Sequence, residues 1–264
     1  VNWGSDPGRV SFGRLYEERG KLLHLAYSRF TPDEAYAAFQ EENARWLPDY
    51  ALFMALKEEN GGAPWLDWPE PLRLREEAAL KNAREACAEE IGYQCFVQYQ
   101  FFRQWKALRG YANSKGIRII GDVPIYVPLD SADVWVNYKL FQLDETRHPT
   151  VVAGCPPDGF TADGQLWGNP IYDWRAMADT GYSWWIKRLT AAAGMYDVVR
   201  FDHFRGFESY WSVPAGDKTA RDGKWVKGPG ADFIHAVQKA LPELDFIAED
   251  LGFVTPEVRS LQLD

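Results

Sequence analysis

Two apolar segments of this chain each end in a carboxylate, and this arrangement constrains the fold more than any other feature. The first runs from Tyr196 to Asp202 and the second from Leu244 to Glu249, while a third segment of the same form ends at Asp122. Helix-like stretches separate the three. Near-continuous apolar strands that alternate with helices predict a parallel sheet covered by helices. The acidic residues are then expected together at the carboxyl edge of that sheet.

Two architectures satisfy this order of strands and helices, an open doubly wound sheet and a (β/α)8 barrel. No glycine-rich phosphate-binding loop follows any of the strands, and acidic residues stand at several strand ends. Both points favour the barrel, whose catalytic residues come from the carboxyl ends of several strands. Only about three strands can be placed with assurance, far fewer than a complete barrel needs. The sequence therefore predicts an α/β fold that is an internal piece of a larger protein.

The balance of apolar and charged residues narrows the class of protein. Hydrophobic residues make up 46% of the 264 residues, enough for one sizeable core or for one domain with an inserted subdomain. The net charge is −9 and no basic run occurs, which argues against nucleic acid and anionic membranes as partners. No apolar run reaches about 18 residues and no signal-peptide pattern occurs, so we expect a cytoplasmic protein.

The cysteines indicate neither disulfide bonds nor a metal site. They are odd in number, sparse and not in metal-ligand spacing, and we interpret them as reduced packing residues. They are Cys87, Cys95 and Cys155.

Aromatic residues are abundant, at 15% of the chain with 12 tryptophans. Many lie in Gly/Pro-rich stretches rather than in periodic ones. Flat rings with a polar edge suit sugars, whose C–H faces stack while their hydroxyls form hydrogen bonds. The alternative is that most of these rings pack loops. The tryptophans of this kind are Trp3, Trp65, Trp68, Trp135, Trp167, Trp174 and Trp225.

The first half of the chain has a helical pattern. Thr31 is expected as the N-cap of a helix that runs to about residue 59, where Gly61 and its neighbour end it. A linker rich in Trp and Pro follows over residues 64–71. A second helical pattern covers about residues 75–113, with a break expected near Gly92.

The second half contains a long irregular connection over residues 123–182, which in a compact domain is usually functional. We assign residues 1–264 to an incomplete catalytic barrel domain, 31–113 to a largely helical insertion and 123–182 to a substrate-loop insertion. The remaining expected elements are strands over 117–121, 197–202 and 245–249, helices over 183–195 and 230–241, a hairpin over 210–226 and a helix from Thr255.

The charged residues at the strand ends suggest acid–base chemistry. Residues two apart in a strand face the same side, so Arg200 and Asp202 should both point into the mouth of the barrel. The guanidinium is expected to lower the pKa of Asp202, as a carboxylate nucleophile requires. Glu249 follows apolar residues, and a dry pocket would raise its pKa so that it can donate a proton. Such an unequal pair is the arrangement of retaining glycoside chemistry.

Other interpretations of these residues remain open. A strand-terminal acid is often a helix cap or a structural salt-bridge partner. Acids at three strand ends can also hold Mg²⁺, although Arg200 would compete with the ion. His203 can bond a substrate hydroxyl or be a structural histidine. Residues 165–170 place two amide side chains around an indole. This segment either binds the hydroxyl groups of a sugar or is a loop stabilised by its own side chains.

Several long motifs closely resemble the 4-alpha-glucanotransferases of glycoside hydrolase family 77, the amylomaltases or disproportionating enzymes. The likeness extends over most of the chain, including Trp46 with the residues before it and the segment 211–214. The motifs are Gly121–Val127, Pro156–Phe160, Gln165–Trp174, Val199–Phe207 and Ile247–Gly252.

The resemblance implies a partial (β/α)8 barrel, about strands 3 to 5 with flanking helices, plus inserted helical and loop subdomains. It implies double-displacement transfer of α-1,4-glucan segments, with Asp202 as the nucleophile and Glu249 as the acid/base. Arg200 and His203 would hold Asp202 and the donor sugar, and Asp122 would stand at the inward end of the third barrel strand.

A loop over the bound glucan is the second implication of the resemblance. Phe160, Gln165, Trp167 and Asn169 would belong to it, and a loop that excludes water would favour transfer to a sugar hydroxyl. The implied partners are α-1,4-glucan oligosaccharides as donor and acceptor, with no cofactor and no metal. A related α-glucan hydrolase and a non-catalytic glucan-binding fragment are the alternatives.

One departure from the family pattern is large. A third essential Asp, next to a His at a later strand end, would follow beyond Asp264, and the N-terminal strands with their glucan-binding aromatic residues are not found. The sequence therefore predicts unpaired sheet edges and little or no activity for this chain alone.

Overall fold

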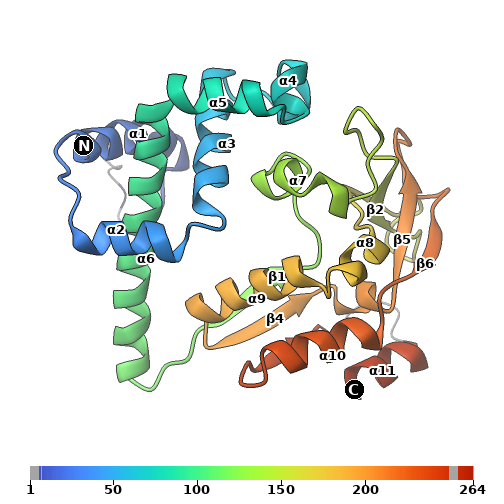
Figure 1. Cartoon of the computed structure of the whole chain (residues 1–264). Helices are drawn as coiled ribbons and strands as arrows, with labels where there is room; N and C mark the ends of the chain where they lie inside the picture. Colours follow the sequence, from blue (N-terminus) through green and yellow to red (C-terminus); the bar gives the residue numbers. More distant parts are fainter. Residues whose placement is uncertain (1–5, 7, 250–254, 264) are drawn as a thin grey trace. The chain divides into compact units, whose positions relative to one another are not determined.

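The computed structural model of the chain describes Asp6, residues 8–249 and residues 255–263. The chain divides into two compact units (Figure 1). The first unit combines Val1–Ala63 with Glu77–Gln104, and the second combines Pro64–Glu76 with Trp105–Asp264. The first is helical, and the second holds both sheets and every candidate site residue.

The first unit packs its helices around an aromatic core. Its helices are α1 (Phe12–Ser28), α2 (Glu34–Glu42), α3 (Leu47–Glu59), α5 (Glu77–Ala86) and the first part of α6 (Ala88–Ser114). The core residues come from α2, α3 and α6, so the apolar faces of these helices meet one another. They are Tyr36, Phe39, Leu47, Ala51, Cys95 and Tyr99.

The helix expected over residues 31–59 is two helices. Asp33 rather than Thr31 caps α2, because its carboxylate accepts the Tyr36 N–H at 2.8 Å. The chain then turns before α3, where Pro48 occupies the first turn. Proline has no N–H with which to continue the hydrogen-bond ladder of the preceding helix. The expected end is confirmed, since α3 stops at Glu59 and Gly61 has a positive φ of 63°.

The second helical pattern also divides differently. The break falls between α5 and α6, at Cys87, and not near Gly92. A Cβ at Gly92 would collide with the Tyr27 side chain of α1, so this glycine allows close packing and does not end a helix. Helix α1 begins before the first helix that the sequence predicted.

The tryptophan-rich linker belongs to the second unit and is ordered. It forms a 3-10 turn, Trp65–Asp67, and a short helix α4, Glu70–Arg73. The Trp65 indole donates to the Leu129 carbonyl at 2.7 Å, and the Trp135 indole of α7 (Ala132–Val136) donates to Leu72 at 3.0 Å. Both rings are fully buried, so they pack loops, as the alternative interpretation held.

The expected parallel sheet is confirmed. Its strands are β1 (Ile120–Pro124), β4 (Val198–Asp202) and β7 (Phe246–Ala248), in the order β1-β4-β7 with both pairs parallel. The first strand begins three residues later than predicted, and alternate residues of it are exposed; Ile120 is one of them. Within the described residues, β1 and β7 are the outer strands.

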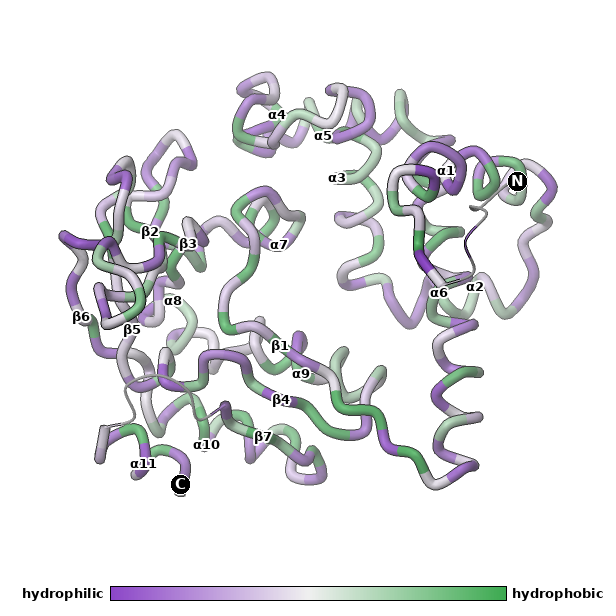
Figure 2. Tube along the Cα trace, turned by 180° about the vertical axis from the view of Figure 1, so that it is seen from behind, coloured by the Kyte–Doolittle hydropathy of each residue, from purple (hydrophilic) through white to green (hydrophobic). Residues whose placement is uncertain are grey.

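One face of this sheet is covered by helices α9 (Ser183–Met195) and α10 (Ala231–Ala240), both at their expected positions (Figure 1). Phe201 of β4 contacts Trp185 of α9, with ring centroids 6.4 Å apart. Hydrophobic residues lie along β4 and β7 (Figure 2). Trp185 packs edge-on against Phe207, which stacks on Phe233 with centroids 4.6 Å apart. This aromatic layer is the core of the second unit.

A second, antiparallel sheet lies in the same unit. Its strands are β2 (Val151–Cys155), β3 (Gln165–Pro170), β5 (Ser209–Pro214) and β6 (Lys224–Lys227), in the order β3-β2-β5-β6. The expected hairpin is confirmed as β5 and β6. The connection over 123–182 is less irregular than predicted, because it contributes β2, β3, α7 and α8 (Trp174–Asp179). Two strands of five and six residues are too short to show a clear alternation in sequence.

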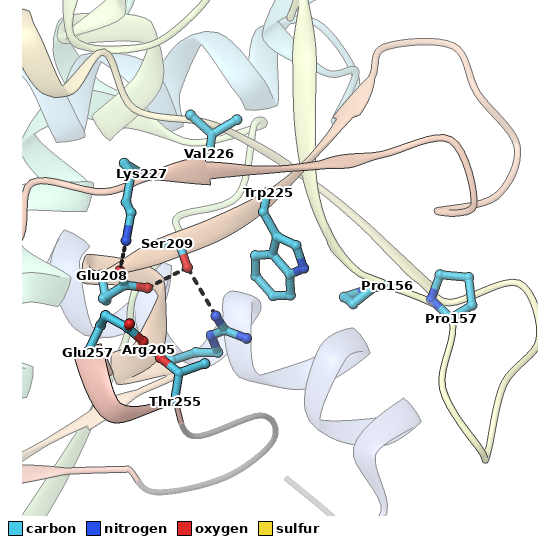
Figure 3. Close-up of a pocket in the computed structure, with 10 residues that line it drawn as sticks. All are labelled: Pro156, Pro157, Arg205, Glu208, Ser209, Trp225, Val226, Lys227, Thr255 and Glu257. Carbon is cyan, nitrogen blue, oxygen red and sulfur yellow. Dashed lines mark hydrogen bonds and ion pairs between the residues drawn. The ribbon is translucent and has the colours of Figure 1, made fainter. Parts of the chain in front are cut away.

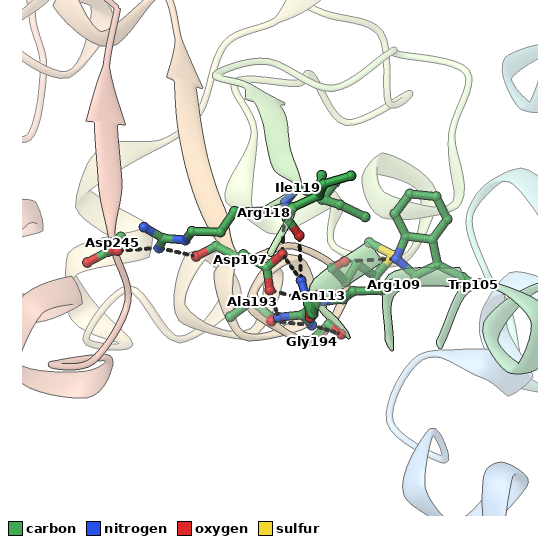
Figure 4. Close-up of polar contacts among 11 residues, drawn as sticks. Trp105, Arg109, Asn113, Arg118, Ile119, Ala193, Gly194, Asp197 and Asp245 are labelled. Atoms are coloured by element: carbon green, nitrogen blue, oxygen red, sulfur yellow. Dashed lines mark hydrogen bonds and ion pairs between the residues drawn. The ribbon is translucent and has the colours of Figure 1, made fainter. Parts of the chain in front are cut away.

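A polar network joins α6 to the amino ends of the parallel strands (Figure 4). The Asp197 carboxylate accepts the Ile119 N–H at 2.8 Å, the Asn113 amide at 2.8 Å and two Arg109 N–H groups at 3.0 and 2.7 Å. Arg109 and Trp105 also donate to carbonyls in the last turn of α9. These bonds fix the end of the sheet opposite the acids.

The helix from Thr255 is confirmed as α11, Pro256–Leu263. None of the described helices is both long and apolar enough to cross a membrane. The predictions for Trp3 and for residues 250–252 of the last motif lie outside the described residues.

Candidate active site

The carboxyl edge of the parallel sheet brings the predicted acids together. Asp122 pairs in register with Arg200, and Pro124 pairs with Asp202. The Glu249 N–H donates to the Phe201 carbonyl at 3.1 Å, which extends the pairing of β7 with β4 by one residue. Since β1, β4 and β7 are parallel, their acids point from one edge, as the sequence predicted. We call Asp122, Arg200, Asp202 and Glu249 the acid cluster.

Arg200 lies at the centre of the acid cluster. Its guanidinium is 2.5 Å from Asp122 through Nη1 and 2.5 Å from Glu249 through Nη2, whereas the nearest Asp202 oxygen is 3.6 Å away. One arginine therefore bridges three strands. Its fork of fixed donors suits this role, because it can hold two carboxylates at defined positions.

The expected low pKa of Asp202 is wrong, although Arg200 does act in the expected direction. Burial, together with the negative charges of Glu249 and Asp122 and a hydrogen bond to Glu249, raises the pKa of Asp202 above its ordinary value. Arg200 opposes this rise but is outweighed, since its hydrogen bonds go to the other two acids. Both carboxyl groups lie near the same guanidinium, Asp202 at 3.6 Å and Glu249 at 2.5 Å.

Glu249 is the less exposed of the paired acids, as expected. Its side chain is 12% exposed, compared with 43% for Asp202. Its Oε1 accepts from Arg200, and its Oε2 accepts from the His203 backbone N–H at 2.6 Å. Both oxygens therefore already have N–H donors.

His203 has an unusual backbone that makes the second of these bonds possible. Its φ of 56° is left-handed, a conformation in which His is over-represented among non-glycine residues. Burial and the nearby Arg205 lower the pKa of the imidazole to about 4, so the ring is neutral at pH 7. Gly206 permits the turn, because a Cβ there would lie 2.6 Å from Ile125 Cδ1 and 3.1 Å from His203 Cδ2.

Strand β3 places an aromatic side chain beside the acid cluster. The Trp167 indole meets the His203 ring edge-to-face, with centroids 4.9 Å apart, and donates to the Gln165 side chain at 3.1 Å. The Asn169 amide donates to the Val127 carbonyl at 3.0 Å and so ties β3 to the chain beyond β1. Trp167 remains 37% exposed, which leaves ring surface for a ligand.

Phe160 is not brought to the acid cluster by any described contact. Its side chain is fully exposed, and its backbone N–H is held by the Asp158 carboxylate at 2.8 Å. This segment is a turn stabilised by its own aspartate, which also accepts from the Thr161 N–H.

The acid cluster does not have the form of a metal site. Among the described residues, no group of three or more His, Cys, Asp or Glu side chains is arranged to hold a metal ion. In the acid cluster, the Arg200 guanidinium lies where a cation would otherwise contact the carboxylates.

The sequence interpretation missed two features of the site. One is the His203 backbone N–H, because a positive φ at histidine leaves no pattern in the neighbouring residues. The other is Tyr126, buried against Trp167 with centroids 6.3 Å apart. A tyrosine directly beyond an acid-ended strand was the only signal for it.

Paired carboxylates at the carboxyl edge of a parallel sheet, beside an arginine and an exposed indole, are typical of enzymes that act on glycosidic bonds. Comparison with known proteins agrees with that class. The family model of the 4-alpha-glucanotransferases, glycoside hydrolase family 77, matches residues 3–264. The chain belongs to this family.

Individual relatives give the extent of the likeness. The 4-alpha-glucanotransferase of Thermus thermophilus is 51% identical over 98% of this chain, and that of Clostridium butyricum is 45% identical over 97%. A solved amylomaltase from Streptococcus agalactiae, in complex with acarbose, superposes on the whole chain with a TM-score of 0.95 and 40% identity. The expected partial-barrel α/β fold is thereby confirmed.

The chain spans about half the length of the relatives it matches. It covers 53% of each of the two enzymes named above and 54% of the solved amylomaltase.

Proposed function

We propose that this chain carries the nucleophile and the acid/base of a retaining 4-alpha-glucanotransferase. The substrates are α-1,4-glucan oligosaccharides, as both donor and acceptor, and no cofactor takes part. The observation that carries the proposal is that Asp202 and Glu249 stand at one sheet edge on either side of Arg200, whose guanidinium is 3.6 Å from the first and 2.5 Å from the second. Carboxyl groups of a retaining pair lie about 5–5.5 Å apart, whereas inverting pairs are more widely separated.

In the first half-reaction, the Asp202 carboxylate attacks the anomeric carbon of the donor. The bond from that carbon to the glycosidic oxygen breaks, and Glu249 transfers its proton to the leaving oxygen. In the second half-reaction, Glu249 removes the proton from an acceptor hydroxyl, whose oxygen attacks the same carbon and releases Asp202. Two displacements retain the anomeric configuration.

The arrangement of Arg200 sets a condition for this reaction. Asp202 must be ionised to attack, yet its pKa is raised while Arg200 bonds Asp122 and Glu249. To act as an acid, Glu249 must carry a proton on one oxygen, yet both of its oxygens accept from N–H groups, which favours the carboxylate without that proton. Both conditions are met if Arg200 releases Glu249 and moves onto Asp202 when the donor sugar binds, a shift from the 3.6 Å separation to hydrogen-bonding distance.

The remaining residues are proposed to bind the glucan. His203 is neutral at pH 7 and can exchange hydrogen bonds with a sugar hydroxyl. Trp167 offers an exposed ring face, and Gln165 fixes its orientation. Asp122 is 58% exposed and can accept from a hydroxyl of the donor sugar. Asn169 holds the β3 strand in place, and Phe160, exposed at its turn, covers the bound glucan.

Product analysis tests the proposal. The chain would replace the matching segment of the Thermus thermophilus enzyme, and the hybrid would be incubated with maltotriose. We expect longer maltodextrins together with glucose, and loss of both in the Asp202→Asn and Glu249→Gln variants. Glucose and maltose without longer products would instead indicate a hydrolase. The 264-residue chain alone is expected to form little or no product.

A further inference from the structure

A pocket lies in the unit that holds the acid cluster and is lined by other residues (Figure 3). Its volume is about 650 Å³, within the range of roughly 300–1,000 Å³ that is usual for small-ligand sites. None of its lining residues belongs to the acid cluster. They are Pro156, Pro157, Arg205, Glu208, Ser209, Trp225, Val226, Lys227, Thr255 and Glu257.

Arg205 is the best-defined polar group of this pocket. It is only 6% exposed, and burial lowers its pKa from the ordinary value. One of its terminal N–H groups donates to the Ser209 hydroxyl at 3.0 Å, and that hydroxyl donates to Glu208 at 2.6 Å. The Arg205 Nε has no hydrogen-bond partner in the structure. A buried N–H without an acceptor is costly, so Arg205 is incompletely satisfied by the contacts within the chain.

Trp225 supplies an apolar surface beside this donor. Its ring lies over the Arg205 guanidinium at 3.9 Å and remains 42% exposed. Figure 3 shows the indole projecting from β6 between Arg205 and the two prolines, Pro156 and Pro157. The indole and the prolines thus form apolar walls that flank the polar floor.

The pocket is assembled before any ligand binds. Strand β6 is paired with β5, and the Gly228 N–H donates to the Glu208 carbonyl at 2.8 Å. Lys227 forms an ion pair with Glu208, which fixes the second polar side chain. Preorganised walls reduce the entropy that the protein's own side chains lose when a ligand binds.

The charges of the pocket favour a neutral ligand. Arg205 and Lys227 are balanced by Glu208 and Glu257, and Lys227 is already paired with Glu208. A nucleotide or another anion would approach as much negative as positive charge. A ligand with many hydroxyls and an apolar face suits the carboxylates and the exposed indole together.

We infer that this pocket is an accessory binding site for a neutral oligosaccharide, separate from the acid cluster. The inference takes its ligand, an α-1,4-glucan, from the proposed function. A glucan held here has a raised effective concentration at the acid cluster, provided that it is long enough to span the two sites.

The test is a titration of the ¹⁵N-labelled chain with maltoheptaose, followed by NMR. The indole N–H signals of Trp225 and Trp167 are assigned from Trp225→Ala and Trp167→Ala. We expect a saturable shift of the Trp225 signal. In Trp225→Ala, where the Lys227 backbone amide signal reports binding instead, the dissociation constant should rise about tenfold from the loss of one stacked ring. Tyr111→Ala, which removes an exposed ring elsewhere in this unit, is the matched control and should leave that binding unchanged.

The two sites fail independently in this experiment. A shift of Trp167 without a shift of Trp225 would overturn the accessory site and leave the proposed function intact. A shift of Trp225 alone would support the accessory site and count against glucan binding at the acid cluster. No shift at either ring, or a Trp225 shift with inorganic phosphate but not with maltoheptaose, would overturn the inference. An unchanged Trp167 signal in Trp225→Ala confirms that this variant is folded.

Discussion

Replacing Asp197 with asparagine should destabilise the unit that holds the acid cluster. The carboxylate accepts four hydrogen bonds, two at each oxygen, and its side chain is 13% exposed. In either orientation, an asparagine amide presents N–H groups to one pair of donors. Two bonds to a charged group are lost, at about 1.5 kcal/mol each, so the free energy of unfolding should fall by about 3 kcal/mol. For a domain of this size, the midpoint of thermal unfolding should fall by roughly 6–12 °C.

Asp245→Asn is the matched control for this variant. Asp245 precedes β7 as Asp197 precedes β4, and it pairs with Arg118 at 2.5 Å. Its side chain is 64% exposed and that of Arg118 is 60% exposed. An exposed pair contributes less than about 1 kcal/mol, so urea unfolding followed by circular dichroism should separate the two variants clearly.

The pH dependence of the same measurement identifies the cause. The Ile119 N–H, followed by Asn113 and Arg109, lowers the pKa of Asp197 to about 2. The carboxylate therefore stabilises the fold fully above the unfolded-state pKa of about 3.9, and this contribution is lost as the pH falls towards 2. The difference between the chain and Asp197→Asn should shrink over that interval. Equal destabilisation by Asp197→Asn and Asp245→Asn at pH 7 would refute the reasoning.

The other predictions concern the acid cluster and its surroundings. Arg200→Lys in the hybrid enzyme should lower kcat by about a hundredfold while the unfolding midpoint changes little, because a lysine cannot bond Asp122 and Asp202 at once, as the proposed reacting arrangement requires; a rate within threefold of the parent would contradict this. Gly206→Ala should lower the free energy of unfolding in urea by about 1–3 kcal/mol, since its Cβ would press on Ile125. An unchanged free energy of unfolding would contradict this. The pKa of His203 is depressed to about 4, so the unfolded state binds more protons below about pH 6.5 and stability should fall from there to about pH 4. His203→Gln should flatten this slope, and an unchanged slope would count against a buried neutral imidazole. A chelator should leave transfer by the hybrid unchanged; if it abolished transfer, a metal would be required.

Much of the fold could be predicted from the sequence, because its signals are local. The apolar runs that end in Asp202 and Glu249 mark strands, and the glycines after residue 59 mark the end of a helix. The helix boundaries near residues 33, 43 and 87 could not be placed. Near residue 33, Thr31 and Asp33 are similar N-caps, so the sequence does not decide between them. Near residue 43, Pro48 starts a new helix.

The candidate site could be predicted in its residues but not in its electrostatics. Residues two apart in a strand share a face, so the proximity of Arg200 and Asp202 follows from spacing alone. Which acid the guanidinium contacts depends on the registers of three strands, and the structure assigns its hydrogen bonds to Asp122 and Glu249. The pKa of Asp202 therefore moves in the direction opposite to the prediction.

The measurement that tests the central proposal most directly is the identification of the covalent intermediate. The hybrid enzyme is incubated with a glycosyl fluoride that carries a second fluorine on the sugar ring, which slows release of the intermediate. Mass spectrometry of the digested protein locates the label. The proposal predicts one glycosyl group on the peptide that contains Asp202, and none in Asp202→Asn. A label on Asp122 or Glu249, or turnover of the substrate with no covalent label on any carboxylate, would contradict it.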